Sequence, residues 1–395
     1  MRRNSYVRAT VIAAALAGIC QRAVFAEQSV REVLSFLVTN RSIATGDFVR
    51  DEQAAAATSD TIARFLSIEL ATLPIASSAG GFIYRFDPAL GTVVRLSDSF
   101  GPFFTERSMT TAKSLASFSI NYRTATFDSI DGRKLRDGTL RSTASILRGD
   151  TEPFDVETVS LRIRLDSITM ASSYGVTDRL EVSAALPIVR LTLQGDRIDT
   201  YRGQRFPQAT GTATASGVGD AVLRAKFNVL QRGGSGIALA TEARLPTGDE
   251  EQLLGAGRAS VKPRLLASLE SARIAVDGDV GYSFRGLARA LDYSGALSVV
   301  ATPRVTLIGE LSGRRLEGFG RLIETTEPHP RLLDVDTIRL TGVADTTNRL
   351  VAVVGFKWNV AGNWLASANV ARPLTKVGLN AHWVPAVTLD YSFGQ

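Results

Sequence analysis

The stretch that decides the fold is His382–Phe393, which reads HWVPAVTLDYSF. Taken at every second residue, it separates into an apolar set and a largely polar set. The apolar set is Trp383, Pro385, Val387, Leu389, Tyr391 and Phe393, and the other set is His382, Val384, Ala386, Thr388, Asp390 and Ser392. A period of two with two such faces indicates a strand between two different solvents. Aromatic residues near both ends of the apolar face are typical of a strand that faces lipid. The stretch therefore predicts the last strand of an outer-membrane β-barrel.

Length and composition agree with a large barrel plus a small additional domain. The chain has 395 residues and a formal net charge of +6, with its Lys and Arg residues spread along the sequence. This distribution does not indicate a nucleic-acid partner. No apolar run reaches the roughly 18 residues that a membrane-spanning helix needs, so strands must do the spanning.

Residues 1–26 have the pattern of a secretory signal peptide. A basic start with Arg2, Arg3 and Arg8 precedes a short apolar run at 9–19, and small residues end at Ala26. Cleavage after Ala26 would remove the only cysteine, Cys20, and with it any disulfide or thiol chemistry. A lipoprotein cut before Cys20 is the alternative, which the bulky Ile19 disfavours.

Residues 27–108 differ from the rest of the chain. Helical spacing occurs over 29–40 and 51–73, and two short strands at 82–86 and 92–96 flank a turn. We interpret this mixed α/β segment as a small periplasmic domain or as a plug inside the barrel. A module that docks a partner is the alternative, and composition alone favours the former.

Residues 109–395 have the alternation of an antiparallel transmembrane β-barrel of about twelve strands. The predicted strands cover 114–127, 156–174, 178–193, 218–230, 236–247, 257–269, 272–286, 290–301, 303–315, 348–360, 363–373 and 381–394. Short turns alternate with longer connections, among them 128–155, 194–217 and 316–347, which is the layout of periplasmic turns and outer loops. An even strand number places both ends in the periplasm, and we interpret 336–343 as an extension above the membrane.

Charged residues fall on the inward face of the predicted strands. An Arg or Lys on the lipid face would cost about 2–4 kcal/mol at the midplane. The candidates for lining the lumen are Arg162, Arg164, Arg224, Lys226, Glu242, Arg244, Lys262, Arg264, Asp277, Asp279, Glu310 and Lys357. These charges either pair to fill and stabilise the barrel or form a selectivity ladder in a pore. A slight basic excess favours anionic solutes.

Folding neighbouring strands about their turns predicts ion pairs in the lumen. A turn at 270–271 sets Lys262 opposite Asp279 and Arg264 opposite Asp277, and a turn at Gly233 sets Arg224 opposite Glu242. Twelve strands fall between a filled barrel of about eight and an open channel of sixteen or more, so a narrow, closable passage is expected.

Several stretches resemble the family of outer-membrane channels named for the meta-pathway of phenol degradation. They are 173–182 (SYGVTDRLEV), 217–220 with Arg224 and Lys226, 245–250 (LPTGDE) with 254–257, 355–363 (GFKWNVAGN) and 390–393 (DYSF). The resemblance covers roughly residues 100–395. It implies a barrel that passes small, aromatic or hydrophobic compounds. The chain departs from the family in its long N-terminal segment and in the two residues after Phe393.

Few side chains could support catalysis. Only His329 and His382 are available, and no metal-binding or phosphate-binding motif is present. We therefore expect neither an enzyme nor a cofactor or metal. The acidic triplet at 249–251 could bind a divalent ion that bridges lipopolysaccharide, although a solvated acidic loop is the preferred interpretation.

The sequence thus predicts a channel in the bacterial outer membrane of a Gram-negative cell. The channel would pass small molecules passively, and the alternative is a structural or adhesive barrel that acts through its long outer loops. The expected partners are outer-membrane lipid and lipopolysaccharide, the barrel-assembly machinery and a small-molecule solute, without nucleic acid.

Overall fold

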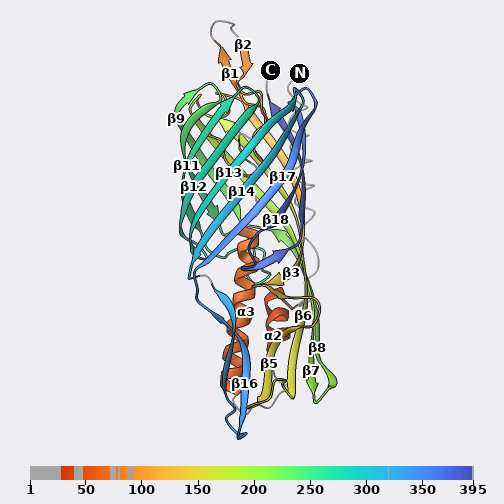
Figure 1. Ribbon diagram of the computed structural model, residues 1–395. Coiled ribbons are helices and arrows are strands. Elements are labelled where there is room, and N and C mark those ends of the chain that lie inside the picture. The colour runs from red at the N-terminus through yellow and green to blue at the C-terminus, as the bar shows by residue number, and fades with distance from the viewer. Residues whose placement is uncertain are drawn as a thin grey trace, which may run out of the picture.

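A computed structural model describes residues 28–39, 48–71, 77–78, 81–87, 92–318 and 320–393. Within this part of the chain, twelve antiparallel strands close a barrel (Figure 1). The predicted fold class is confirmed. The predicted signal peptide at 1–26, Cys20 and the last two residues lie outside the described residues.

The twelve barrel strands follow one another around the ring with antiparallel neighbours. They are β3 (Ala116–Ile130), β6 (Asp155–Gly175), β7 (Leu180–Tyr201), β9 (Ala221–Arg232), β10 (Ser235–Leu245), β11 (Ser260–Ser271), β12 (Ile274–Arg285), β13 (Arg289–Thr302), β14 (Val305–Glu317), β17 (Thr347–Ala361), β18 (Trp364–Pro373) and β20 (Val384–Phe393). The last strand, β20, closes the ring against β3, with Leu389 opposite Ile120 and Tyr391 opposite Phe118. Full closure leaves no strand edge unpaired in the membrane, which a transmembrane sheet requires.

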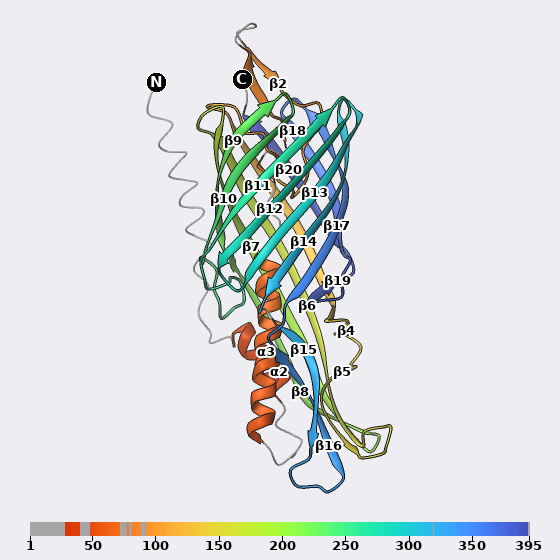
Figure 2. The same cartoon turned by 60° about the vertical axis from the view of Figure 1, so that its left-hand side comes forward.

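The segments 128–155, 194–217 and 316–347, expected as outer loops, are largely strands. They contain β4 (Arg133–Lys134), β5 (Leu140–Leu147), most of β8 (Gln204–Val218), β15 (Arg321–Pro328) and β16 (Val335–Val343). The short β19 (Leu379–Ala381) completes the sheet beside β3. Strand β5 pairs with both β6 and β16, so the wall continues beyond one end of the barrel as a curved extension (Figures 1 and 2). The interpretation of 336–343 as an extension agrees with β16.

The outer membrane boundary is visible as an inversion of polarity along β7. Towards the short-turn end, Val182 and Ile188 are exposed on the outer face, while Glu181 is buried on the inner face. Beyond Ile188 the pattern reverses, because the outer face carries polar residues and the inner face carries buried Leu191 and Leu193. Up to Ile188 the apolar residues of β7 therefore face lipid. Beyond Ile188 they face the inside of the extension, away from solvent.

Two helices shield the inner face of the extension from solvent. They are α2 (Val30–Val38) and α3 (Phe48–Ala71), and both lie against the inner face of the extension (Figure 2). Ser29 caps α2 in a capping box with Glu32, which fixes where the helix begins. Leu34 and Leu37 of α2 are fully buried in the main apolar core. Neither described helix is long and apolar enough to cross a membrane.

The packing of α2 on the sheet is close enough to require glycine. A Cβ added to Gly195 of β7 would lie 2.7 Å from Cδ1 of Leu37. Because real Cβ atoms do not approach a neighbour so closely, Gly195 is a contact position for the helix.

The rest of the N-terminal segment lies elsewhere. The strands β1 (Tyr84–Asp87) and β2 (Thr92–Arg95) form a hairpin that projects from the opposite end of the barrel, where the C-terminus lies (Figure 1). Residues 97–111 then make contacts with the inner wall of the barrel before β3 begins. Within the described part of the segment 27–108, the two helices lie against the extension, and the last residues lie in the lumen.

Candidate functional site

Residues 97–111, here called the plug segment, cross the lumen and contact strands on several sides of the barrel. The carboxylate of Glu310 on β14 accepts hydrogen bonds from the backbone N–H groups of Phe103, Phe104 and Thr105. The Nζ atom of Lys357 on β17 donates to the Pro102 carbonyl oxygen at 3.0 Å. Both wall residues are buried, so the polar backbone of the plug segment is satisfied by charged side chains of the lumen.

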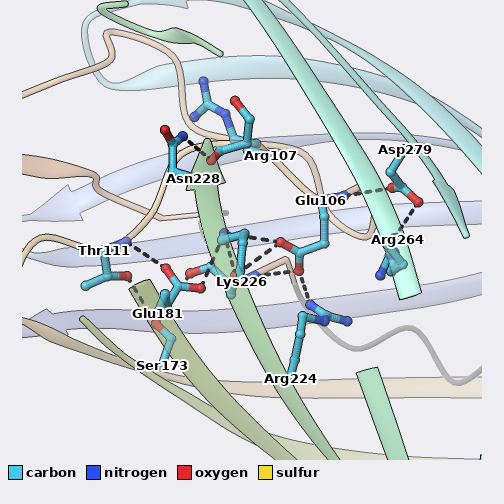
Figure 3. Close-up of polar contacts among 12 residues, drawn as sticks. Glu106, Arg107, Thr111, Ser173, Glu181, Arg224, Lys226, Asn228, Arg264 and Asp279 are labelled. Atoms are coloured by element: carbon cyan, nitrogen blue, oxygen red, sulfur yellow. Dashed lines mark hydrogen bonds and ion pairs between the residues drawn. The ribbon is translucent and has the colours of Figure 1, made fainter. Parts of the chain in front are cut away.

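Glu106 lies at the centre of this arrangement (Figure 3). Its fully buried carboxylate pairs with the Arg224 guanidinium and with the Lys226 ammonium at 3.5 Å. The backbone N–H of Ser78 also donates to it at 2.9 Å, and its own backbone N–H donates to the carboxylate of Asp279 at 3.1 Å. One plug residue therefore contacts β9, β12 and Ser78.

Arg107, the next residue, binds the opposite sign of charge. Its side chain is fully buried and lies 3.4 Å from a carboxylate oxygen of Glu270 and 3.6 Å from one of Asp277. The alternation of Glu106 and Arg107 thus matches a cationic patch on β9 and an anionic patch on β11 and β12. This match fixes the position of the plug segment along the barrel.

Two further contacts hold the plug segment at the short-turn end of the barrel. The backbone N–H of Thr111 donates to Glu181 of β7 at 2.6 Å, and Glu181 also pairs with Lys226 at 3.3 Å (Figure 3). The backbone N–H of Ser108 donates to Oγ of Ser268 on β11 at 2.9 Å.

Ten of the twelve predicted lumen residues have buried or largely buried side chains inside the barrel. These are Arg224, Lys226, Glu242, Arg244, Lys262, Arg264, Asp277, Asp279, Glu310 and Lys357. The prediction for Arg162 and Arg164 was wrong, because both are exposed on the outer face of β6. Their part of β6 lies beyond the polarity inversion, where Leu161 and Ile163 face inward instead.

The predicted register was right for one pair and wrong for another. Glu242 lies directly opposite Arg224, and their side chains pair at 2.7 Å. Between β11 and β12, however, Leu266 lies opposite Asp279, because the turn falls at 272–273, two residues later than expected. Arg264 therefore reaches Asp279 diagonally, at 2.5 Å.

The displaced register also changes the partners of the remaining residues. Lys262, expected to face Asp279, bridges Glu242 at 3.3 Å and Asp292 at 3.1 Å. Asp277, expected to face Arg264, lies opposite Ser268 and pairs with Arg107 of the plug segment.

Sequence reasoning missed Glu106 and Arg107 as lumen residues. They precede the first predicted strand, so no alternation marks them. A signal was nevertheless present, since they are the only charged residues in the stretch 99–112, SFGPFFTERSMTTA. An isolated pair of opposite charges in an uncharged, non-helical stretch is a candidate for burial with partners.

A cavity of about 180 Å³ remains in the lumen between the plug segment and the end of α3. Phe104 and Thr105 of the plug segment line one part of it, and Glu69 of α3 lines another. Glu69 pairs with Arg123 of β3 and Arg349 of β17, which attaches the helix to the barrel wall. The lumen is therefore occupied at both ends, with a space between the two.

The described residues contain no group of three or more His, Cys, Asp or Glu side chains that could hold a metal ion. The acidic triplet instead contacts α2, because Glu250 and Glu251 each lie 3.8 Å from Arg31. Nδ1 of His329 accepts backbone hydrogen bonds from Arg331 and Leu332 in a turn.

The comparisons with known proteins agree with this architecture. Residues 136–306, somewhat less than half of the chain, match the model of the family described as "Putative MetA-pathway of phenol degradation". A search of the curated proteins found no match.

Among solved structures, the chain is similar to an outer membrane channel from Pseudomonas putida F1, with 16% identity, a TM-score of 0.45, and 72% of this chain and 98% of that one covered. It is also similar to a FadL homologue from Pseudomonas aeruginosa, with 10% identity, a TM-score of 0.35, and 82% and 99% covered. The CymD monoaromatic hydrocarbon channel shares 10% identity with a TM-score of 0.26, and 72% of this chain and 89% of that one are covered.

Proposed function

We propose that this barrel is a channel for the passive passage of small molecules and that the plug segment is its gate. The observation that carries the proposal is the cavity of about 180 Å³ inside a lumen whose wall is charged along several strands. A barrel with a purely structural role has no need of an internal space lined by unequal numbers of charges. Passage requires the plug segment to leave its position, because it occupies the periplasmic half of the lumen.

The contacts of the plug segment suit a movable part. Many of them are hydrogen bonds and ion pairs to charged wall residues, such as Glu310, Arg224 and Asp277. The buried apolar side chains of the plug segment are few, chiefly Phe100, Phe103 and Met109. When the plug segment moves, water can hydrate these groups, which offsets much of the lost interaction. The helices α2 and α3, in contrast, bury many apolar side chains in the main core, and exposing those to water has no such compensation.

The cavity favours solutes of the size of a single aromatic ring. Its volume is close to the roughly 150 Å³ of an engineered apolar cavity that holds benzene. Phe104, Val351 and Val353 supply apolar lining surface. Small aromatic or hydrophobic compounds, which the resemblance to phenol-degradation channels implies, therefore fit this space.

The substitution Glu106→Gln tests the gate. It removes the charge that pairs with Arg224 and Lys226 but keeps the shape of the side chain. Breaking a buried pair costs about 3–5 kcal/mol, and the wall cations can recover part of this by hydration only if the plug segment opens. We therefore expect the variant to conduct more than the wild type in planar bilayers.

The matched control is Glu152→Gln, which lies on an exposed outer turn and should conduct like the wild type. If wild type and Glu106→Gln are both silent, the barrel does not transport. The alternative of a structural or adhesive barrel, which acts through its outer extension, would then hold.

The partners of the barrel follow from its surface. At the short-turn end, the rings of Trp364 and Tyr391 lie 4.7 Å apart and those of Tyr391 and Phe393 lie 4.8 Å apart. Such an aromatic belt anchors a barrel at the lipid interface. We propose that this end contacts the barrel-assembly machinery during insertion and that the exposed arginines of β6 contact lipopolysaccharide.

A further inference from the structure

The lining of the central cavity divides into two arcs of the barrel wall. The arc from β9 to β14 carries most of the charges, whereas the arc from β17 through β20 to β3 is mostly apolar. The charged arc contributes eight charged side chains, from Arg224 on β9 to Arg314 on β14. The second arc contributes Phe127, Val351, Val353, Ala371, Pro373 and Val384, and its two charged residues, Arg123 and Arg349, pair with Glu69 of α3. A molecule in this space would meet charge on one side and mostly hydrocarbon on the other.

Cations exceed carboxylates in the lining, with seven Arg or Lys side chains against four Asp or Glu side chains. The carboxylates are already shared among several cations. Glu242 alone lies within 3.4 Å of Arg224, Lys262 and Arg264, and Asp292 contacts Lys262 and Arg314. The cavity therefore has an excess of positive charge that its own acids do not neutralise.

Arg244 makes no direct contact with these acids. It is only 8% exposed, and within the described part of the chain its guanidinium makes no hydrogen bond and no ion pair within 4.0 Å, because Glu242 and Asp220 act on it only from a greater distance. It lines the central cavity and also a smaller adjacent cavity of about 50 Å³. A buried guanidinium without a partner is costly, so a native protein that keeps one usually supplies a counter-charge from elsewhere.

Asn369 on β18 gives a second, independent indication. It is 4% exposed and lines the cavity, and neither its amide nitrogen nor its amide oxygen has a hydrogen-bond partner among the described residues. Buried polar groups are nearly always hydrogen-bonded, and each exception calls for a missing partner. Two unsatisfied polar side chains on different arcs thus face the same space.

We propose that the central cavity binds a small organic anion with an apolar body, such as an aromatic carboxylate, and that Arg244 binds its carboxylate. Arg and carboxylate form two parallel charge-assisted hydrogen bonds, which fixes orientation as well as affinity. The ring lies against the apolar arc, and Asn369 hydrogen-bonds a polar atom of the ligand. This inference rests on the proposed channel function and names the solute class of that same space.

Isothermal titration of the purified full-length protein in detergent tests the inference, with sodium benzoate as the probe and benzyl alcohol as its neutral counterpart. We expect benzoate to bind more tightly than benzyl alcohol. In Arg244→Gln the dissociation constant of benzoate should rise about tenfold or more, while that of benzyl alcohol stays unchanged. Arg190→Gln, which removes an exposed arginine from the outer face of β7, is the matched control and should bind like the wild type.

The stability of Arg244→Gln separates a binding role from a structural one. Because Arg244 makes no ion pair, its replacement should leave the melting temperature unchanged or raise it. The inference is overturned if benzoate does not bind, if benzyl alcohol binds as tightly, or if Arg244→Gln binds benzoate like the wild type. Since binding is measured without transport, a barrel that binds benzoate but does not conduct contradicts only the channel. A barrel that conducts without binding benzoate contradicts only this inference.

Discussion

Asp155 and Asp199 lie on the inner face of the outer extension, well beyond the membrane boundary on β6 and β7. One carboxylate oxygen of each is buried and has no partner that could donate a proton to it. Burial of the carboxyl group, a hydrogen bond to Asp199 and the negative charges of Asp199 and Glu157 raise the pKa of Asp155 from its ordinary value of 3.8 to about 7. In the folded extension Asp155 therefore keeps its proton up to about pH 7 and donates it in a hydrogen bond to Asp199.

This pair makes the extension sensitive to pH. Because the pKa of Asp155 is higher in the folded state than in the unfolded one, the folded extension is favoured at low pH and loses that stability progressively as pH rises from about 4 to about 7. We expect amide hydrogen exchange in β6 and in the hairpin of β7 and β8 to quicken, beyond the intrinsic effect of pH, between about pH 4 and pH 7. In Asp155→Asn the additional change should disappear, because the amide donates a hydrogen bond to Asp199 at every pH.

Asp196→Asn is the control, since Asp196 is exposed on the same hairpin and binds Thr210 at 3.0 Å. It should keep the pH dependence of the wild type. An Asp155→Asn variant that still loosens with rising pH would show that another group titrates there.

At the scale of elements, α2 and α3 determine how the extension is built. Their apolar residues supply the interior that the strands above the membrane face, which is why the polarity of β6 and β7 inverts at the boundary. We expect α2 and α3 to detach from the extension while the barrel stays closed, because the barrel strands are joined to one another by their own backbone hydrogen bonds.

The substitution Leu34→Ala tests this independence. Leu34 is fully buried, so the change should cost about 2–5 kcal/mol of local stability. We expect faster proteolysis within α2 and α3, with an unchanged thermal unfolding of the barrel in detergent. Phe36→Ala on the same helix is the control, since Phe36 is 48% exposed and should behave like the wild type. If Leu34→Ala lowered the barrel transition equally, helices and barrel would unfold as one unit.

The strands of the barrel could be predicted from the sequence, whereas the extension could not. A lipid-facing strand can be recognised from its own residues, because apolar residues that face lipid alternate with polar residues that face the lumen. Above Ile188 the same alternation continues with the faces exchanged, so a rule that places charges inward assigns Arg162 and Arg164 to the wrong side. The exchange depends on α2 and α3, which are distant in sequence.

The candidate site could be predicted only in part for a similar reason. Inward charges such as Arg224 and Glu242 follow from strand parity, and their pairing follows from a glycine turn. The turn between β11 and β12 contains no glycine, and Ala272 adopts a positive φ of 48° there. The sequence therefore does not show where this turn lies, and the predicted register between β11 and β12 was wrong. The contacts of Glu106 with β9, β12 and Ser78 depend on tertiary structure that no local pattern encodes.

At the scale of the whole molecule, the lumen is divided into three levels. The helices cover the outer end, the plug segment closes the periplasmic half, and the cavity with Arg244 and Asn369 lies between them. A solute held in this cavity can continue only if the plug segment moves, so its movement is the central claim of the channel proposal.

The most direct measurement is the bilayer conductance of a Ser108→Cys, Ser268→Cys variant before and after reduction. Ser108 belongs to the plug segment, and its backbone N–H lies 2.9 Å from Oγ of Ser268, so a disulfide would fix the plug segment to β11. The control is Ser117→Cys, Ser173→Cys, which links β3 to β6 within the wall, where the two Oγ atoms lie 2.7 Å apart. We predict that the oxidised plug variant is silent, that reduction restores the wild-type conductance, and that the wall variant conducts equally in both states. An oxidised plug variant that conducts like the wild type would contradict the account.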